Sequence, residues 1–472
     1  MAYGSAIQQH LYYSSPFFLK NIISSFYGVQ QRKARYGSQF EQSMKFLRDS
    51  EYWDNNRLKG YQVDRTTAFL VERIEKTPCY RNGNAYRAYL KNQDFKEIPI
   101  LTKTELRNNL ERFYPDDLNS TPHRWAHTSG TTGKSLIFPI SLSCFQREYA
   151  FRNLHYSWGK VNFIGRDKIA FCSGHPVAFH DRATPPFWVY DWKNNWLLLS
   201  SYHLSEKNLV FYIRELEKFG PVMIGGYPSS IYLLALAYKK HGSSGGLNLR
   251  AVYTASETLF DYQRETIEDA FGCRTFNWYG NSEMCANIVE CEEGELHLKL
   301  EHSLVEILGD DNRECQPGES GRLVCTGFTN DCFPLIRYDI GDTVTLSSNQ
   351  VSKCGRGGTL IECITGRVED YIITPDGRFV GRLDHIFKDS KNVIEAQIVQ
   401  NNVDEVLLKI VRDSGFNSHD ERAIAEEARQ RLGSSIKLRF EYVDHLPRTS
   451  NGKFRFIEST INHTEVLKSL VG

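Results

Sequence analysis

The chain has 472 residues, more than one ordinary hydrophobic core supports, so we expect at least two domains. Hydrophobic residues make up 41% of the chain and charged residues 24%, a composition typical of a folded protein rather than a disordered one. The 57 Lys and Arg residues balance the 57 Asp and Glu residues. A chain whose main task is to bind nucleic acid usually carries a basic surplus, so no nucleic-acid partner is expected.

The cysteines and the N-terminal residues indicate the cellular compartment in which the protein is expected. Eleven cysteines, an odd number without the spacing of a small disulfide scaffold, indicate a reducing compartment, and we expect a cytoplasmic protein. No uncharged apolar run approaches the ~18 residues of a transmembrane segment, and no signal-peptide pattern is present. The aromatic, mildly basic segment from Tyr12 to Tyr27 is predicted to pack on the body of the protein, with a membrane surface or a partner as the alternative. For the oligomeric state, a monomer and a dimer are both compatible with the sequence.

The clearest predicted elements lie between Ser205 and Tyr279. Ser205 can cap a helix that stops at Gly220, and a short buried strand at 222–224 follows. The alternation continues with a helix at 229–240, a strand at 251–254, a helix to about residue 271 and a strand at 274–278. Such a pattern predicts parallel strands joined by right-handed crossovers.

Small and polar residues follow each of these strands. In parallel sheets, ligands bind beyond the carboxyl ends of the strands. Those ends carry Gly225-Gly226-Tyr227, Ala255-Ser256-Glu257 and Tyr279-Gly280-Asn281-Ser282-Glu283. The sequence therefore predicts a site at this edge of the sheet.

The remaining segments predict smaller units. Residues 301–346 read as short strands with Gly and Pro turns, and residues beyond 366 predict a compact α+β unit. We therefore predict an α/β protein in two domains. Residues 1–368 would form a large N-terminal domain of parallel and mixed sheets with helices and a small β-rich unit, and residues 369–472 a mobile α+β lid.

The strongest local signal is a run of small and hydroxyl-bearing residues that ends in a lysine: Thr128, Ser129, Gly130, Thr131, Thr132, Gly133 and Lys134. The amides and hydroxyls of such a loop can surround phosphate oxygens, and the lysine adds a mobile positive charge. A flexible turn without a ligand is the plainer interpretation. A Walker A loop would need glycine at position 128 and a helix directly afterwards, whereas residues 136–140 predict a strand. A P-loop kinase is therefore disfavoured.

At this point the chain resembles the adenylate-forming superfamily of acyl-CoA synthetases and adenylation domains, which use such a loop. Five further segments resemble family motifs in chain order. Ala255-Ser256-Glu257 resembles the adenine-side segment, residues 279–283 resemble the aromatic-Gly-x-Ser/Thr-Glu motif, and residues 338–342 resemble the ribose-binding Tyr-x-x-Gly-Asp motif. Residues 366–370 resemble the hinge, and residues 447–453 resemble the catalytic-lysine motif. Residues 97–107 and Val289-Glu290-Cys291 are similar to phenylacetate–CoA ligase relatives. The nearest likeness is the CapK-type branch, associated with capsular polysaccharide synthesis.

The resemblance implies activation of a small carboxylic acid by ATP and Mg²⁺, with pyrophosphate release. Because both reactants are anions, positioning and charge neutralisation dominate such a reaction. By this resemblance, Glu283 holds Mg²⁺, Ser282 donates a hydrogen bond to a phosphate oxygen, and the ring of Tyr279 faces the adenine. Asp342 accepts hydrogen bonds from the ribose hydroxyls, and Arg367 reaches the ribose or a phosphate. Lys453 bridges the carboxylate of the acid and the α-phosphate of ATP. Ser256, Glu257 and Gly280 are also assigned to nucleotide binding, and Glu369 to the hinge.

These residues also have plainer interpretations: a helix-start carboxylate for Glu283, a turn cap for Asp342, a solvated lysine for Lys453 and an ion-pair partner for Arg367. Six motif matches in order favour the functional roles. His175 and Tyr227 are candidates for the acid pocket, with a core or surface role as an equal alternative.

Cys291, His297, Cys354 and Cys363 could converge on a structural zinc ion, because thiolates and imidazole suit that metal. By resemblance, some relatives carry zinc near a matching Cys-x5-His. A close Cys pair is missing, since Ser352 stands two residues before Cys354, and ordinary buried side chains are the default interpretation.

The sequence gives less information about the acyl acceptor than about the first step of the reaction. CoA is the acceptor that the family uses most, so transfer to CoA is predicted first. The segment from Tyr371 to Arg378 lacks the glycine-rich loop that often admits the pantetheine arm, which keeps a sugar amine or hydroxyl as the alternative. A non-catalytic nucleotide-binding regulator and a peripheral scaffold of a capsule assembly complex are the hypotheses from other classes.

Overall fold

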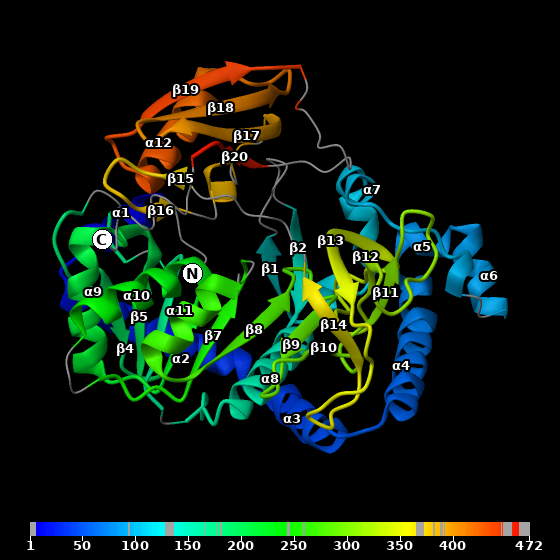
Figure 1. Ribbon diagram of the computed structural model, residues 1–472. Helices are drawn as coiled ribbons and strands as arrows, with labels where there is room; N and C mark the ends of the chain where they lie inside the picture. The colour runs from blue at the N-terminus through cyan, green and yellow to red at the C-terminus, as the bar shows by residue number, and fades with distance from the viewer. Residues whose placement is uncertain are drawn as a thin grey trace.

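A computed structural model describes residues 6–92, 95–127, 136–165, 167–175, 177–179, 182–242, 246–257, 259, 261–364, 372–380, 383–387, 390, 392–444, 446 and 456–461. A twelve-stranded sheet runs through the middle of the molecule, helices cover it, and a smaller unit of C-terminal residues lies against one side (Figure 1). In this described part of the chain, no helix has the length and apolar character needed to cross a membrane.

The N-terminal region is helical. Helices α1 and α2 lie along one end of the sheet, and α4 to α7 along the other (Figure 1). Asp54 starts α4 by accepting a hydrogen bond from the backbone N–H of Arg57 at 2.9 Å. The helices are α1 (Ala6–Ser14), α2 (Phe17–Arg35), α3 (Ser38–Ser50), α4 (Asn55–Lys76), α5 (Pro78–Arg81), α6 (Asn84–Asn92) and α7 (Lys103–Asn108), with 3-10 helices η1 (Phe95–Glu97), η2 (Leu110–Phe113) and η3 (Leu118–Ser120).

One half of the sheet contains the predicted β-α-β-α-β alternation. Its parallel strands lie in the order β5-β3-β6-β7-β8, and β4 pairs antiparallel at the outer edge. Gly220 ends α9 in a left-handed conformation, whereas Ser205 stands at the N-cap without a capping side-chain bond. The elements are β3 (Ile169–Ser173), β4 (Trp188–Asp191), β5 (Trp196–Ser200), η4 (Ser201–His203), α9 (Glu206–Phe219), β6 (Met223–Gly226), α10 (Pro228–His241), β7 (Ala251–Ala255), α11 (Asp261–Phe271) and β8 (Arg274–Gly280).

The other half is antiparallel and continuous with the first. β9 pairs with β8, β10 pairs with β9 and β14, and the order ends β14-β13-β12-β11. The β-rich stretch that the sequence predicts as a small unit is therefore hydrogen-bonded into the same sheet as the parallel strands. Its strands are β9 (Asn287–Glu290), β10 (Leu296–Leu298), β11 (Leu304–Leu308), β12 (Ser320–Thr326), β13 (Tyr338–Leu346) and β14 (Thr359–Ile364).

A separate hairpin precedes the large sheet in the chain. β1 (His123–His127) pairs antiparallel with β2 (Ile137–Ser141), which bears out the strand expected after Lys134. Ser141 caps the following helix, α8 (Leu142–Trp158), by accepting a hydrogen bond from the backbone N–H of Cys144 at 3.2 Å. Residues 128–135, which include the predicted phosphate loop, lie outside the described residues.

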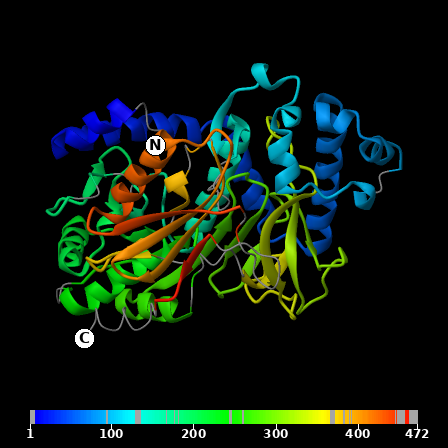
Figure 2. The same cartoon turned by 90° about the horizontal axis from the view of Figure 1, so that it is seen from above.

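The C-terminal residues form the predicted α+β unit. A four-stranded sheet in the order β19-β18-β17-β20 packs with helix α12 (Figure 2). The predicted domain boundary at 368/369 lies outside the described residues and stays a prediction. The elements are β15 (Ile372–Ile373), β16 (Phe379–Val380), η5 (Leu383–Phe387), β17 (Val393–Asn402), β18 (Glu405–Arg412), α12 (Ser418–Leu432), β19 (Lys437–Tyr442) and β20 (Ile457–Ser459).

Two buried arginines join this unit to the end of β5. Arg378 donates to the backbone carbonyl of Tyr202 at 2.7 Å, and Arg431 donates to the hydroxyl of Tyr202 at 3.0 Å. Arg378 also donates to the carbonyls of Arg431 and Leu432, at 3.1 and 2.7 Å, at the end of α12. One tyrosine therefore contacts the C-terminal unit through both its backbone and its side chain.

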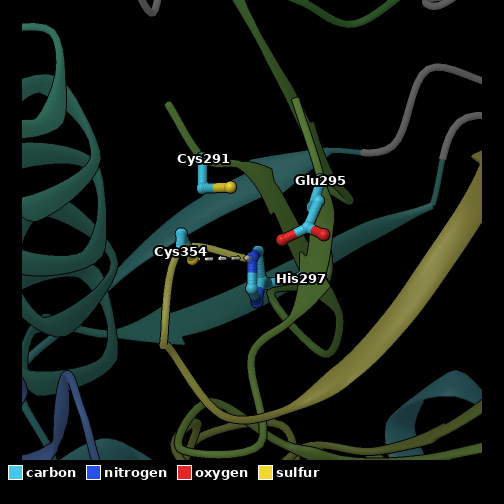
Figure 3. A group of neighbouring side chains, drawn as sticks. All are labelled: Cys291, Glu295, His297 and Cys354. Carbon is cyan, nitrogen blue, oxygen red and sulfur yellow. Dashed lines mark hydrogen bonds between the residues drawn. The ribbon is translucent and has the colours of Figure 1, made fainter. Parts of the chain in front are cut away.

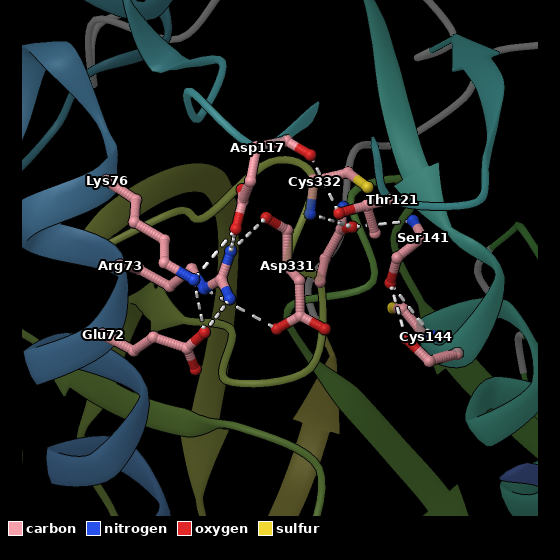
Figure 4. Close-up of polar contacts among 11 residues, drawn as sticks. Glu72, Arg73, Lys76, Asp117, Thr121, Ser141, Cys144, Asp331 and Cys332 are labelled. Carbon is pink, nitrogen blue, oxygen red and sulfur yellow. Dashed lines mark hydrogen bonds and ion pairs between the residues drawn. The ribbon is translucent and has the colours of Figure 1, made fainter. Parts of the chain in front are cut away.

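Arg73 of α4 is buried and is the centre of an ionic cluster whose carboxylates reach the surface (Figure 4). Its guanidinium donates to both carboxylate oxygens of Asp117 at 3.3 Å and to the backbone carbonyl of Asp331 at 3.3 Å. Glu72 is a further ion-pair partner. The cluster therefore holds the loop around Asp331 against α4.

The residue next to Asp331 supports the β1–β2 hairpin. Asn330 accepts a hydrogen bond from the backbone N–H of Ser141 at 2.9 Å and donates to the carbonyl of Pro139 at 3.1 Å. Both partners belong to β2, so the position of this hairpin depends on the loop that Arg73 holds.

Replacing Arg73 with methionine should lower the free energy of unfolding by about 2 kcal/mol, because the half-buried carboxylate of Asp117 and the carbonyl of Asp331 lose a buried charged donor. Arg57 of the same helix is the control: its side chain is 59% exposed and its ion pair with Asp49 is 3.9 Å long, so Arg57→Met should cost less than about 1 kcal/mol. Urea unfolding of both variants measures the difference. Equal losses in the two variants would contradict the structural role of Arg73.

Candidate active site at the ends of the parallel strands

The carboxyl ends of β6, β7 and β8 are neighbours at one edge of the sheet. Gly226 ends β6 with a φ of 152°, and a Cβ at this position would lie 1.9 Å from the carbonyl oxygen of Cys172. Only glycine fits such a position. Ser256, which follows β7 and is exposed, takes a φ of 73°. Both strands therefore end in sharp turns.

Glu257 contacts the beginning of α10. Its carboxylate accepts hydrogen bonds from the hydroxyl of Ser229 at 2.8 Å and from the backbone N–H of the same residue at 3.3 Å. A carboxylate at a helix N-terminus stabilises the unpaired N–H groups of the first turn. Glu257 thus has a structural contact, while nucleotide binding by Ser256 and Glu257 stays a prediction.

The loop between β8 and β9 is shaped by Asn281. Its side-chain oxygen accepts hydrogen bonds from the backbone N–H groups of Cys285 at 2.9 Å and Ala286 at 3.3 Å. Ser282 is half-buried in this turn, and Glu283 is buried with 6% of its surface exposed. The loop therefore directs the Glu283 carboxylate into the protein.

Glu283 is bonded to the antiparallel half of the sheet. Its Oε1 accepts a hydrogen bond at 3.2 Å from the hydroxyl of Tyr338, a fully buried residue at the start of β13. Strands β9, β10 and β14 separate β8 from β13 in the sheet order. The antiparallel half must therefore curve back so that β13 meets the loop after β8.

A second tyrosine makes a matching contact. The hydroxyl of Tyr279, at the end of β8, donates to Oδ2 of Asp342 on β13 at 2.7 Å. Burial, followed by the charge of Asp342, raises the pKa of Tyr279 well above its ordinary value of 10.0. The phenol is thus a neutral donor to a carboxylate, a charge-assisted and short type of hydrogen bond.

The structure therefore brings Tyr279 to Asp342 and Glu283 to Tyr338, whereas nucleotide or magnesium binding by Tyr279, Gly280, Ser282, Glu283 and Asp342 stays a prediction. Tyr338 belongs with them, although no role was assigned to it from the sequence. The available signal was its position, because it is the tyrosine of the Tyr-x-x-Gly-Asp motif.

The segment at residues 97–107 docks beside this site. The backbone N–H of Leu101 donates to the carbonyl of Arg337 at 2.8 Å, and the carbonyl of Leu101 accepts from Asp339 at 2.9 Å. Arg337 is buried and donates two hydrogen bonds, at 2.9 and 2.8 Å, to the carboxylate of Glu306. These contacts flank Tyr338 on both sides along the chain and fix the start of β13.

Several predicted site residues fall outside the described part of the chain: Thr128, Ser129, Gly130, Thr131, Thr132, Gly133, Lys134, Arg367, Glu369 and Lys453. Their roles in phosphate binding, at the hinge and in catalysis stay predictions.

Polar side chains also gather after β3. A Cβ on Gly174 would lie 3.0 Å from the hydroxyl of Tyr202 and 3.1 Å from that of Tyr227. Burial lowers the pKa of the adjacent His175 to about 4, so its imidazole is neutral near pH 7. An uncharged imidazole and two phenols can orient a polar substrate, and the acid-pocket interpretation of His175 and Tyr227 stays open.

A possible metal site lies at the β9–β10 hairpin. One ligand atom from each of Cys291, Glu295, His297 and Cys354 lies within 4.8 Å of the others, and the four side chains point to a common centre (Figure 3). Among the described residues, Nδ1 of the buried His297 has no hydrogen-bond partner, and Nε2 lies 3.4 Å from Sγ of Cys354. Two sulfurs, an imidazole and a carboxylate form a donor set that suits zinc.

The surroundings of Cys354 favour its thiolate. Burial by itself would raise the pKa of Cys354, but hydrogen bonds with His297, Ser352 and Arg356 outweigh burial and lower the pKa to about 6. Thiolate is the form that binds metal. The chemistry of this cluster is therefore consistent with a bound cation.

Cys363 does not belong to this group. It is an exposed residue of β14, and its sulfur lies 3.3 Å from the hydroxyl of Thr345. The predicted zinc set thus changes in one position: Glu295 stands where Cys363 was expected. Glu295 lies two residues before His297, but carboxylates are common in turns, so its sequence position alone did not mark it as a ligand.

The chain is similar to known proteins along most of its length. Residues 372–460 match the family model of the CapK C-terminal domain. Over 463 residues the chain is 27% identical to Protein CapK of Staphylococcus aureus, covering 96% of this chain and 99% of that protein. It is also 24% identical over 456 residues to phenylacetate-coenzyme A ligase of Thermus thermophilus, covering 87% of this chain and 98% of the ligase. Over most of its length the chain is thus similar to CapK-type and phenylacetate–CoA ligase relatives of the adenylate-forming superfamily.

A solved structure shows the same fold. 2-Hydroxyisobutyryl-CoA ligase, in complex with 2-HIB-AMP and CoA, superimposes with a TM-score of 0.56 at 17% identity, covering 89% of this chain and 95% of the ligase. The likeness confirms the predicted architecture of a large α/β part followed by a small α+β part.

Replacing Tyr279 with phenylalanine should lower the free energy of unfolding by about 1.5 kcal/mol near neutral pH, because Asp342 loses its donor. The folded-state pKa of Tyr279 lies above 10.0, so this contribution is complete below pH 10 and declines as the pH rises further through the folded-state pKa. Urea unfolding of both proteins between neutral and alkaline pH measures the trend. A stability difference that grows above pH 10 would contradict it.

Proposed function

We propose that the protein activates a small carboxylic acid as its acyl-adenylate, using ATP and Mg²⁺, and then transfers the acyl group to CoA. The observation that carries this proposal is the convergence of Tyr279, Glu283 and Asp342 on one site beyond the end of β8. The reaction class is that of phenylacetate-coenzyme A ligases, to which the chain is similar over most of its length.

The first step joins two anions. A carboxylate oxygen of the acid attacks the α-phosphorus of ATP, and the bond to pyrophosphate breaks. Glu283 would hold Mg²⁺, which protein sites usually bind through one or two carboxylates together with phosphate oxygens. Tyr338 donates to Oε1 of Glu283 and thereby sets the orientation in which the carboxylate meets the cation. Ser282, in the same loop, would donate to a phosphate oxygen.

Nucleotide binding would use the same edge of the sheet. Asp342 would accept the ribose hydroxyls, and the hydrogen bond from Tyr279 holds its carboxylate in place. The ring of Tyr279 would face the adenine, with Gly280, Ser256 and Glu257 nearby in the chain. The loop from Thr128 to Lys134 would surround the phosphates, and Arg367 would reach the ribose or a phosphate.

Lys453 would supply the positive charge between the carboxylate and the α-phosphate. We place it on a lid of residues 369–472 that moves about Glu369, so that adenylation and acyl transfer use different lid positions. Arg378 and Arg431 bond this unit to Tyr202 in the arrangement described above. Moving the lid would break these bonds.

A sugar amine or hydroxyl is the second candidate acceptor. The turn that follows β15 closes tightly, since the backbone N–H of Thr374 donates to the carbonyl of Arg378 at 2.9 Å and the guanidinium of Arg378 pairs with Asp376 at 2.9 Å. This turn occupies the chain position where many relatives carry a glycine-rich loop.

Glu283→Gln and Lys453→Ala should each lower acid-dependent ATP–pyrophosphate exchange by about 10²–10³, because each removes charge stabilisation from the transition state. Matched controls are Glu293→Gln and Lys437→Ala, which change the same charges at exposed positions and should keep the exchange rate. The assay is run with a panel of carboxylic acids to find the substrate. Full activity in both Glu283→Gln and Lys453→Ala would contradict the assigned roles.

The same assay identifies the acceptor. CoA and an amino sugar are supplied separately after the adenylate has formed. Acyl-CoA as the product supports the CoA-ligase proposal, whereas an acylated sugar without acyl-CoA supports the second candidate.

We also propose that Cys291, Glu295, His297 and Cys354 bind one zinc ion with a structural role. Ligand atoms this close together need only small movements to reach the distances of about 2.0–2.3 Å that zinc requires. The ion would bind the loop that carries Cys354 to the β9–β10 hairpin. Arg356 of that loop also donates to Glu51 at the end of α3 at 2.8 Å, so the site would stabilise a contact between distant segments.

Purified protein should contain about one zinc ion per chain, measured by plasma mass spectrometry. His297→Ala and a Cys291→Ser/Cys354→Ser double variant should lose the metal and unfold at lower temperature, because the ligand set is incomplete. Cys363→Ser is the control and should keep both properties. Full zinc occupancy in the double variant, or metal-free wild-type protein after growth with zinc, would contradict the site.

A further inference from the structure

Helix α2 has its apolar side turned outward. The residues that it buries are small or polar: Lys20, Ser24, Ser25 and Gly28. The residues on the opposite side are large, apolar and exposed: Phe18, Leu19, Ile22, Ile23 and Phe26. Phe18 exposes 65% of its surface and Phe26 78%. A helix that only packs on a protein shows the reverse arrangement, with its apolar stripe buried.

Specific contacts fix this orientation. Asn21 accepts a hydrogen bond at 3.0 Å from the backbone N–H of Tyr190 on β4, and Ser25 accepts one at 3.0 Å from the backbone N–H of Trp192. At Gly28 a Cβ would lie 2.0 Å from Oδ2 of Asp191. The polar side of α2 therefore fits the edge of the sheet closely, and a rotation of the helix would break all three contacts.

The outward apolar surface extends beyond the helix. Trp192 is 49% exposed, and the centroid of its ring lies 6.2 Å from that of Phe18. Leu11 of α1 is also exposed. We name these seven side chains the α2 outer face: Leu11, Phe18, Leu19, Ile22, Ile23, Phe26 and Trp192. The two N-terminal helices lie on the outside of the molecule, drawn in dark blue (Figure 2).

The charges near this face are positive. The first acidic residue of the chain is Glu41, so neither α1 nor α2 contains a carboxylate. Lys33 is exposed in the last turn of α2, and Lys193 is exposed next to Trp192. Exposed Phe, Leu, Ile and Trp side chains with basic neighbours are typical of helices that lie in the plane of a membrane surface.

We propose that the α2 outer face binds the surface of a lipid bilayer that contains anionic lipids, with α2 lying in the boundary between headgroups and acyl chains. Lys33 and Lys193 would meet lipid phosphates while the seven apolar side chains enter the bilayer. A second copy of the chain fits less well, because a stable protein interface engages about 20–30 residues on each side. Symmetric pairing of this face would also bring basic residues together without acidic partners.

The test uses the full-length protein and vesicles of phosphatidylcholine with or without phosphatidylglycerol. The protein should sediment with the vesicles that contain phosphatidylglycerol, and less so at high salt, because screening weakens the contribution of the lysines. A Phe18→Ser/Phe26→Ser double variant should bind about tenfold or more weakly, because two large side chains no longer leave water.

The matched control is a Val63→Ser/Val351→Ser double variant, which changes two exposed apolar residues elsewhere and should bind as the wild type does. Circular dichroism and the pyrophosphate exchange rate in free solution should be the same for all three proteins. Absence of binding to anionic vesicles, or equal binding by the Phe18→Ser/Phe26→Ser variant, would overturn the proposal. So would a wild-type dimer in solution that this variant loses.

Discussion

The reversal of chain direction after β8 is the constraint on which the candidate site depends. β9 returns antiparallel to β8, and the side chain of Asn281 closes the turn by binding two backbone N–H groups. This return joins the parallel and antiparallel strands into a single sheet and turns Glu283 inward. Two tyrosine hydroxyls, one from each half, then bond to a carboxylate of the other half. Glu283 and Asp342 are thereby oriented before any ligand binds.

Buried arginines hold the segments around this sheet together. Arg73, Arg337 and Arg378 each donate both to a carboxylate and to backbone carbonyls of another segment. The planar guanidinium suits this use because its five donors can satisfy several acceptors at once without losing its charge. Although the net charge of the chain is zero, buried arginines pair locally with carboxylates, and each of these pairs holds one loop or unit in place.

Local patterns were enough to predict part of this molecule. The alternation between Ser205 and Tyr279 gave the parallel strands and their helices, because hydrophobic periodicity and helix stops such as Gly220 are local properties. The motif residues Glu283 and Asp342 were found for a different reason, since their spacing in the chain resembles that of a known family. Tyr338 was missed because its partner Glu283 lies 55 residues away in the sequence, and Glu295 because a carboxylate in a turn is too common to indicate a ligand. The joining of all twelve strands into a single sheet was also not predicted, because hydrophobic periodicity does not indicate which strand edge β14 pairs with.

The unbroken sheet also limits where motion can occur. Glu283 and Asp342 lie on elements of one hydrogen-bonded body, and direct bonds to tyrosines tie each to the opposite half. Their separation therefore cannot change by relative movement of two halves, in contrast to sites built between separate bodies. The β1–β2 hairpin and the C-terminal unit form separate sheets, so a change of shape between bodies is open to them but not to the two halves of the large sheet. The orientation of Glu283 relative to Asp342 would then stay the same while those separate sheets move.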